Sequence, residues 1–140
     1  MTLNELYRAA KTALEPVTED PTFEAACLLE HFCGANRTEL LLHGDKPAES
    51  EAEQAVLFAL EKRKTGEPLQ YLLGEWDFMS LTLSCGEGVL IPREDTAVLV
   101  EAVCKRLSKT ENLPKGLDLC AGTGAAVSYT HLTLPTTSRV

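Results

Sequence analysis

The residues best suited to chemistry form a glycine loop late in the chain. Residues 116–125 read GLDLCAGTGA, in which a short apolar run containing Asp118 leads to Gly122 and Gly124. Closely spaced glycines let a backbone approach a bound nucleoside without a side-chain clash, and a helix that follows presents its N–H groups there. The segment therefore predicts a strand over 117–120, a cofactor loop and a helix.

Two common phosphate-binding loops do not match this segment. A P-loop ends in Gly-Lys-Ser or Gly-Lys-Thr, and no such ending follows Gly124. A dinucleotide fingerprint needs a third glycine or an alanine where this chain has Val127. What remains, a strand acid followed by Gly-x-Gly, is similar to the first motif of class I methyltransferases, whose loop surrounds S-adenosylmethionine.

Two upstream segments extend the resemblance. Residues 66–83 begin with Gly-Glu-Pro and continue through a Gly-x-x-x-Phe connector that ends at Phe78. Residues 89–103 contain an Ile-Pro-Arg-x-x-Thr run at 91–96, followed by a helical pattern. The order and spacing of these elements across 66–125 resemble the release factor glutamine methyltransferase family (HemK/PrmC).

The resemblance implies a cofactor site built from both parts of this stretch. The residues that it assigns to S-adenosylmethionine are Phe78, Arg93, Thr96, Asp118, Cys120, Ala121, Gly122, Thr123 and Gly124. Glu94 replaces the proline that usually follows the arginine, and Cys120 and Ala121 stand where many members have glycine and threonine. Both are small, so the close backbone approach survives. Each of two residues has an alternative role to cofactor binding. Arg93 equally suits a structural clamp between the helix and the connector, and Phe78 equally suits a core position.

The resemblance also implies a reaction. Members of this family are described as transferring a methyl group from S-adenosylmethionine to the amide nitrogen of the glutamine in the GGQ motif of peptide chain release factors. An amide nitrogen is a poor nucleophile, so the NPPY motif that holds it is expected to work by positioning and electrostatics. No NPPY occurs in this sequence. We therefore assign no catalytic residue and expect no methyl transfer from this chain alone.

Composition and charge favour a soluble globular protein over a nucleic-acid binder. The 140 residues are 44% hydrophobic and 24% charged, and 13 basic against 21 acidic side chains give a net charge of −8. A broad grip on phosphate backbones is therefore disfavoured, which argues against the alternative of an N6-adenine methyltransferase. No apolar run reaches the roughly 20 residues of a membrane span, and no signal-peptide core is present, so a cytoplasmic location is expected.

The cysteines and histidines form no recognisable metal or disulfide pattern. The five cysteines are odd in number and never occur as Cys-x-x-Cys, so we expect reduced, mostly buried thiols. His31 and His43 lie on or beside apolar helical patterns, and His131 lies close to the C-terminus. We therefore expect no metal site.

Hydrophobic spacing and caps predict an all-helical bundle over residues 1–66. Thr2 and Glu5 form a capping-box pair ahead of the first helix, and Asp20 caps the second. Two further helices are expected at 38–43 and 48–64. The resemblance implies that this bundle docks the substrate. An alternative for the isolated chain is that it acts only as a helical protein-binding module.

Residues 67–92 are predicted to be a hairpin connector. The signals are an apolar run at 69–73, an apolar–polar alternation at 81–84 and glycines that punctuate both. A helix over 93–107 then opens residues 93–126, the incomplete start of a class I, Rossmann-like methyltransferase domain. The predicted fold class is α/β overall, with an all-α bundle in front.

Residues 127–140 differ in character from the rest of the chain. Their opening, VSYTHLTLPT, resembles the translation of a transposon-type sequencing adapter. The β-branched residues and Pro135 leave no apolar face at helical spacing after Val127. We expect this tail to be non-native, with the enzyme's own sequence ending at Ala125 or within Ala126.

Overall fold

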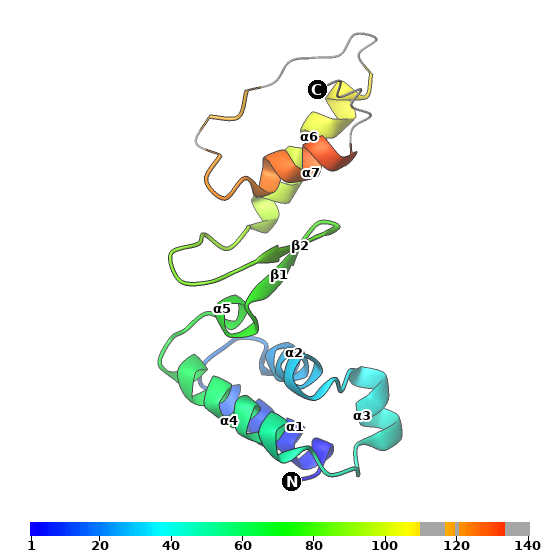
Figure 1. The fold of residues 1–140 in the computed structure, drawn as a ribbon, viewed down its shortest axis with the longest axis vertical. Coiled ribbons are helices and arrows are strands. Elements are labelled where there is room, and N and C mark those ends of the chain that lie inside the picture. Colours follow the sequence, from blue (N-terminus) through cyan, green and yellow to red (C-terminus); the bar gives the residue numbers. More distant parts are fainter. Residues whose placement is uncertain (110–116, 120, 134–140) are drawn as a thin grey trace. The chain divides into compact units, whose positions relative to one another are not determined.

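The protein was analysed as a computed structural model, which describes residues 1–109, 117–119 and 121–133. The chain divides into two compact units, Met1–Leu73 and Gly74–Val140, and each is described by itself. The helices of the first unit are α1 (Leu3–Leu14), α2 (Pro21–Cys33), α3 (Arg37–His43), α4 (Ser50–Lys64) and α5 (Leu69–Leu73) (Figure 1). Across the described ranges, no helix combines the length and the apolar character needed to cross a membrane.

The helix ends of the first unit follow from local side-chain chemistry. The Glu5 N–H donates to the Thr2 hydroxyl at 3.2 Å, and the Thr2 N–H donates to the Glu5 carboxylate at 2.8 Å, which completes the predicted capping box. The Phe23 N–H donates to the Asp20 carboxylate at 3.0 Å at the start of α2. Gly34 ends α2 at a φ of 62°, a left-handed conformation that glycine adopts without a steric cost.

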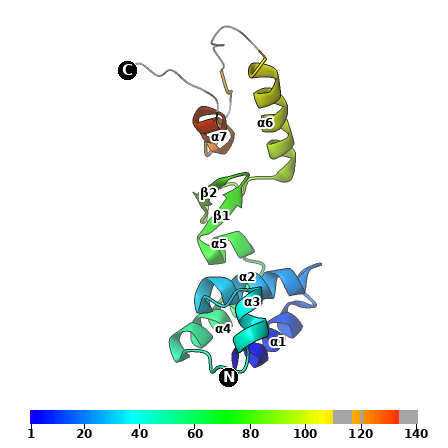
Figure 2. The same cartoon turned by 90° about the vertical axis from the view of Figure 1, so that its right-hand side faces the viewer.

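The core of the first unit lies between α1, α2 and α4, which pack against one another (Figures 1 and 2). Apolar residues on the facing sides are almost completely buried: Leu6, Ala10, Leu14, Ala25, Leu28, Leu29, Val56, Ala59 and Leu60. The α1 residues recur every four positions, which is the spacing of one helix face. Since burying one leucine contributes about 1.5 to 3 kcal/mol, this cluster is the main source of the unit's stability.

A buried ion pair joins α2 to α4. The Arg63 Nε donates to Glu24 at 2.7 Å and the Arg63 Nη2 donates to the other carboxylate oxygen at 2.9 Å. The Glu24 side chain is only 10% exposed, and the Arg63 side chain is 17% exposed. Burial by itself raises the pKa of Glu24, but the hydrogen bonds from Arg63 and Thr18 and the Arg63 charge outweigh it, so the pKa lies below its usual value.

The predicted helices are present with small shifts, but the first arm of the predicted connector is wrong. The long helix begins at Ser50, two residues later than expected. The apolar run Leu69–Leu73 is helix α5 and lies within the first compact unit, whereas the sequence placed it in the connector beyond residue 66. Leu69 is buried, and the Tyr71 N–H donates to the Pro68 carbonyl at 3.0 Å to start the turn. Packing against α2 and α4 therefore accounts for the helical conformation of residues 69–73.

The second unit contains a hairpin of β1 (Glu75–Phe78) and β2 (Leu81–Ser84), followed by α6 (Glu94–Leu107) and α7 (Ala125–Thr133). Only β2 lies on a segment that the sequence predicted as an arm of the hairpin. The strands are antiparallel, with Asp77 opposite Thr82 and a 2.7 Å hydrogen bond from the threonine hydroxyl to the aspartate. Phe78, Val100 and Ala125 form a small buried cluster in which the hairpin, α6 and α7 meet.

The predicted strand over 117–120 is not formed in the part of it that the structure describes. Leu117 and Leu119 lie outside any strand and are 83% and 76% exposed, and Cys120 falls outside the described residues. A parallel strand needs a neighbour to satisfy its backbone hydrogen bonds, and among the described residues the only sheet is the two-stranded hairpin. A Rossmann-like sheet is therefore not seen here.

Helix continues into the first residues of the segment 127–140, where no apolar helical face was expected and where, of the residues described, only Tyr129 packs against the buried cluster. Helix α7 runs from Ala125 to Thr133. Ala125 is buried, and Ala126 and Tyr129 pack against the same cluster, so one short face at helical spacing suffices. The alanines at the start of α7 also have a high helix propensity, which offsets the β-branched residues that follow.

We predict that the Glu24–Arg63 pair makes the stability of the helical unit depend on pH. Because the folded-state pKa of Glu24 is lowered, the pair stabilises the fold above the unfolded pKa of about 4.3, and this stabilisation is lost as the pH falls through the folded-state pKa. The conservative variant Glu24→Gln is expected to lower the free energy of unfolding by about 1 to 3 kcal/mol at neutral pH.

Urea unfolding followed by far-ultraviolet circular dichroism at several pH values measures this effect. The difference between wild type and Glu24→Gln should be largest near neutral pH and should shrink in acid. An equal difference at every pH would contradict the assignment.

Candidate functional site

The glycine loop forms a tight turn directly before a helix. Gly122 and Gly124 have φ values of 58° and 76°, and the Gly124 N–H donates to the Ala121 carbonyl at 3.0 Å, which closes a tight turn. Helix α7 begins at the next residue, Ala125. A Cβ added at Gly124 would meet no atom within 4 Å, so backbone conformation, and not crowding, requires glycine there.

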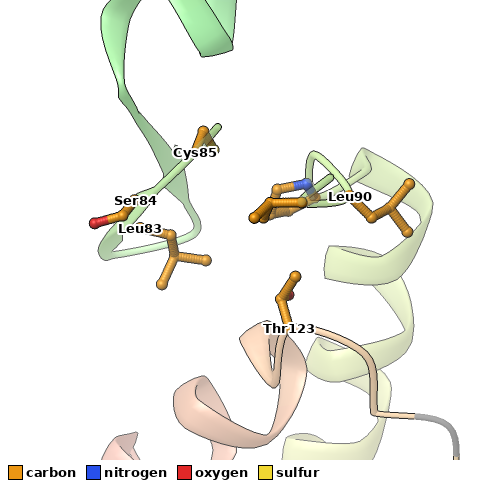
Figure 3. A pocket seen from close by; sticks show the side chains of 7 residues that line it. Leu83, Ser84, Cys85, Leu90 and Thr123 are labelled. Atoms are coloured by element: carbon orange, nitrogen blue, oxygen red, sulfur yellow. The ribbon is translucent and has the colours of Figure 1, made fainter. Parts of the chain in front are cut away.

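One of the predicted site residues, Thr123, borders a small cavity of about 160 Å³. The cavity is lined by Leu83, Ser84, Cys85, Val89, Leu90, Pro92 and Thr123 (Figure 3). In Figure 3, Thr123 projects from the loop before α7 towards this space, while Leu83 and Cys85 belong to β2 and to the residue after it. The lining is largely apolar, and the volume is below the roughly 300 Å³ at which ligand pockets begin.

Two other predicted residues, Phe78 and Arg93, line a second and larger cavity of about 500 Å³. Its further lining residues include several acids and the hairpin turn: Asp77, Met79, Ser80, Pro92, Glu94, Ala97, Glu101 and Tyr129. Pro92 borders both cavities. The structure thus brings Phe78 and Arg93 to one cavity and Thr123 to the other.

Of the remaining predicted residues, Cys120 lies outside the described residues, and the other five line neither cavity. Thr96 is half-buried in the first turn of α6, where its N–H donates to the Arg93 carbonyl at 3.0 Å. Asp118 is exposed, and so are Ala121 and Gly122. The eight residues of this set that the structure describes therefore line no single pocket that fits S-adenosylmethionine.

The two alternatives left open by the sequence have different outcomes. Phe78 is a core residue, because it is 4% exposed and packs with Val100 and Ala125 while also forming a wall of the larger cavity. Arg93 is exposed, and in the residues that the structure describes no ion pair of Arg93 is found. The structure therefore gives no support for Arg93 as a charged clamp between helix and connector.

One unusual residue at the larger cavity has no signal in the sequence. Met79 is the first residue of the two-residue hairpin loop and has a φ of 57°, a left-handed conformation that a non-glycine residue rarely adopts. Such loops usually carry glycine or asparagine, and Met-Ser contains neither. Met79 packs against the Phe78 cluster, so packing offsets the backbone strain.

The four described cysteines are unpaired, as the sequence predicts. Cys85 is buried, whereas Cys27, Cys33 and Cys104 are only half-buried, so the expected burial is right for one of them. Burial raises the pKa values of the Cys27, Cys33 and Cys85 thiols, which makes them less reactive at neutral pH. Where the structure describes the chain, no three metal-binding side chains gather.

The order of the elements is the one that the resemblance implies for a methyltransferase with a helical domain ahead of its cofactor-binding part: helical unit, hairpin, Ile-Pro-Arg segment and glycine loop. Comparison with known proteins defines the class. A family model described as the PrmC N-terminal domain matches residues 5–74, half of the chain and nearly the whole helical unit. The chain belongs to this family.

Curated relatives share one name, release factor glutamine methyltransferase. The relative from Haemophilus influenzae is 39% identical over 120 residues, which cover 83% of this chain and 41% of the relative. The relative from Escherichia coli is 41% identical over 108 residues, covering 77% and 38%, respectively. The relative from Moorella thermoacetica is 38% identical over 133 residues, covering 94% and 47%. The chain thus spans about two fifths to one half of the length of these relatives.

We predict that Phe78→Ala unfolds the second unit locally, because it removes the largest side chain of a three-residue buried cluster. Truncating a buried phenylalanine costs about 3 to 5 kcal/mol, more than a hairpin supported by two helices is expected to tolerate. Trp76, the only tryptophan, lies on the same strand, so its fluorescence reports the loss.

Thr82→Ala is the matched control, since Thr82 is exposed and loses only its hydrogen bond to Asp77. Its fluorescence should stay close to that of wild type. A Phe78→Ala spectrum identical to wild type would show that Phe78 does not support the unit.

Proposed function

We propose that this chain carries the substrate-docking domain and the first cofactor loop of a methyltransferase that uses S-adenosylmethionine. The proposed substrate is the glutamine of the GGQ motif in peptide chain release factors, methylated on its side-chain amide nitrogen, and the proposed location is the cytoplasm. The single observation that carries this proposal is membership of the PrmC N-terminal domain family over residues 5–74. The common name of the relatives supports the substrate.

We further propose that 93–126 is the start of a Rossmann-like domain, with 117–120 as its first strand and 127–140 as a non-native tail. Helix α6 supports the proposal that 93–126 begins a Rossmann-like domain, because this helix is apolar on two sides. Ala97 and Val100 pack against the buried cluster, while Val98 and Leu99 are 68% and 62% exposed on another face. A helix that is apolar on two sides suits a place between two layers, such as a second helix and a sheet.

A docking module without catalysis is the second candidate for the isolated chain. The helical unit has caps, a buried core and an internal ion pair, so it contains what a small domain needs to fold. The proposed cofactor residues, by contrast, are divided between two cavities and the exposed loop. We therefore expect docking to the release factor to be retained and cofactor binding to be weak in this chain.

Calorimetric titration separates these functions. We expect the purified chain to bind a bacterial peptide chain release factor with a Kd in the micromolar range and to show no saturable binding of S-adenosylmethionine. We also expect no transfer of a radiolabelled methyl group to the release factor, because no NPPY motif is present to hold the amide.

Two outcomes would change the proposal. Saturable cofactor binding that Gly124→Val abolishes would mean that the loop forms a site in this chain, since valine strains the left-handed backbone at Gly124. No detectable binding of the release factor would overturn docking as the function of the helical unit. A release factor in which the glutamine of the GGQ motif is substituted serves as the control for methyl transfer, because it lacks the side chain that would receive the radiolabelled methyl group.

A further inference from the structure

Helix α3 is unlike the other helices of the first unit, because none of its residues is buried. Its sequence nevertheless contains three consecutive leucines, Leu40, Leu41 and Leu42. Leu41 and Leu42 are 80% and 70% exposed, the largest exposed fractions of any large apolar side chains in this unit. Leucines this exposed contribute little to the folded core, so their apolar surface is available to a partner.

Backbone contacts, and not the leucines, hold the end of α3 in place. The Asn4 N–H donates to the Gly44 carbonyl at 2.9 Å, and the Leu3 N–H donates to the Lys46 carbonyl at 3.0 Å. Gly44 is buried, and a Cβ there would collide with the Asn4 side chain and the Leu40 carbonyl. The start of α1 and the residues after α3 therefore fit closely, which fixes α3 without using the apolar surface of Leu41 and Leu42.

We propose that Leu41 and Leu42, here called the α3 ridge, insert into an apolar groove on a basic surface of the release factor. This inference rests on the proposed docking function and specifies which part of the helical unit makes the contact. The ridge has the two properties that interface anchors need: it is apolar, and it is rigidly presented by the backbone contacts of Gly44 and Lys46.

The area of the ridge argues against a second copy of this chain as the occupant. Each leucine side chain offers on the order of 100 Å² of apolar surface, so two ridges packed about a two-fold axis bury roughly 400 Å². A specific interface needs about 1,000 Å² or more. The ridge alone is therefore too small for self-association, and it suits insertion into a concave surface that supplies most of the contact area.

Charge points to a basic partner. Residues 1–73 contain thirteen acidic and seven basic side chains, so the helical unit holds most of the negative charge of the chain. In the sequence around the ridge, residues 37–49, the charges nearly balance, with Glu39, Asp45 and Glu49 against Arg37 and Lys46. The excess charge therefore acts through the unit as a whole, where it speeds encounter with a positive surface and weakens with added salt.

A matched control lies on another helix of the same unit. Phe58 on α4 is 66% exposed, so it is also a large apolar side chain at the surface. The Lys62 ammonium lies 5.8 Å from the centre of its ring, which gives Phe58 a partner within the chain. Substituting Phe58 thus removes a similar apolar area without changing the α3 ridge.

The test compares the double variant Leu41→Gln, Leu42→Gln with Phe58→Gln in calorimetric titrations against a bacterial release factor. Glutamine has nearly the helix propensity of leucine, so α3 should persist, and circular dichroism should show the wild-type helical signal and melting temperature. We expect the Kd of the double variant to rise at least about tenfold and that of Phe58→Gln to change less than about twofold. The wild-type Kd should also rise with ionic strength.

Several results would overturn the inference. An unchanged Kd for the folded double variant, or an equal loss in Phe58→Gln, would remove the α3 ridge as the contact while leaving the docking function in place. A wild-type chain that sediments as a dimer, and becomes monomeric in the double variant, would show a second copy as the occupant. No binding of the release factor by wild type would overturn the docking function and this inference with it.

Discussion

The contact between Glu24 and Arg63 constrains the whole helical unit. A carboxylate and a guanidinium that are 10% and 17% exposed are tolerated only if each satisfies the other, because an unpaired buried charge costs several kcal/mol. The bidentate geometry fixes how α2 lies along α4, since sliding either helix by one turn would separate the pair. Leu6, Ala10 and Leu14 of α1 then pack against a surface whose shape is already determined.

Elements with a local cause could be predicted from the sequence. The capping box at Thr2 and the cap at Asp20 each depend on a few neighbouring residues, and both are observed. Helix α5 and the residues Leu117 to Leu119 could not be predicted, because their conformations depend on distant partners. Leu69 finds such partners in α2 and α4, whereas the apolar residues near 117 have no strand beside them in the described part of the chain.

The candidate site shows the same division. The left-handed conformations of Gly122 and Gly124 have a local cause, because glycine adopts positive φ without a steric cost, whereas the cofactor role of the loop stays a prediction. How this loop meets Phe78 and Arg93 is a matter of tertiary packing, which no local pattern specifies. The left-handed Met79 had no sequence signal at all, because its conformation is imposed by the hairpin and by the cluster below it.

The packing of α1 also bears on how the chain folds during synthesis. Helix α1 leaves the ribosome before α4, yet part of its surface packs against α4, whose buried residues Val56 and Leu60 are made roughly 50 residues after Leu6. At about 5 to 20 residues per second, that surface stays open to water for on the order of several seconds. Helix α2 arrives earlier and packs closely on α1, so the pair forms a partly covered hairpin of helices that shields the nascent chain until α4 closes the bundle.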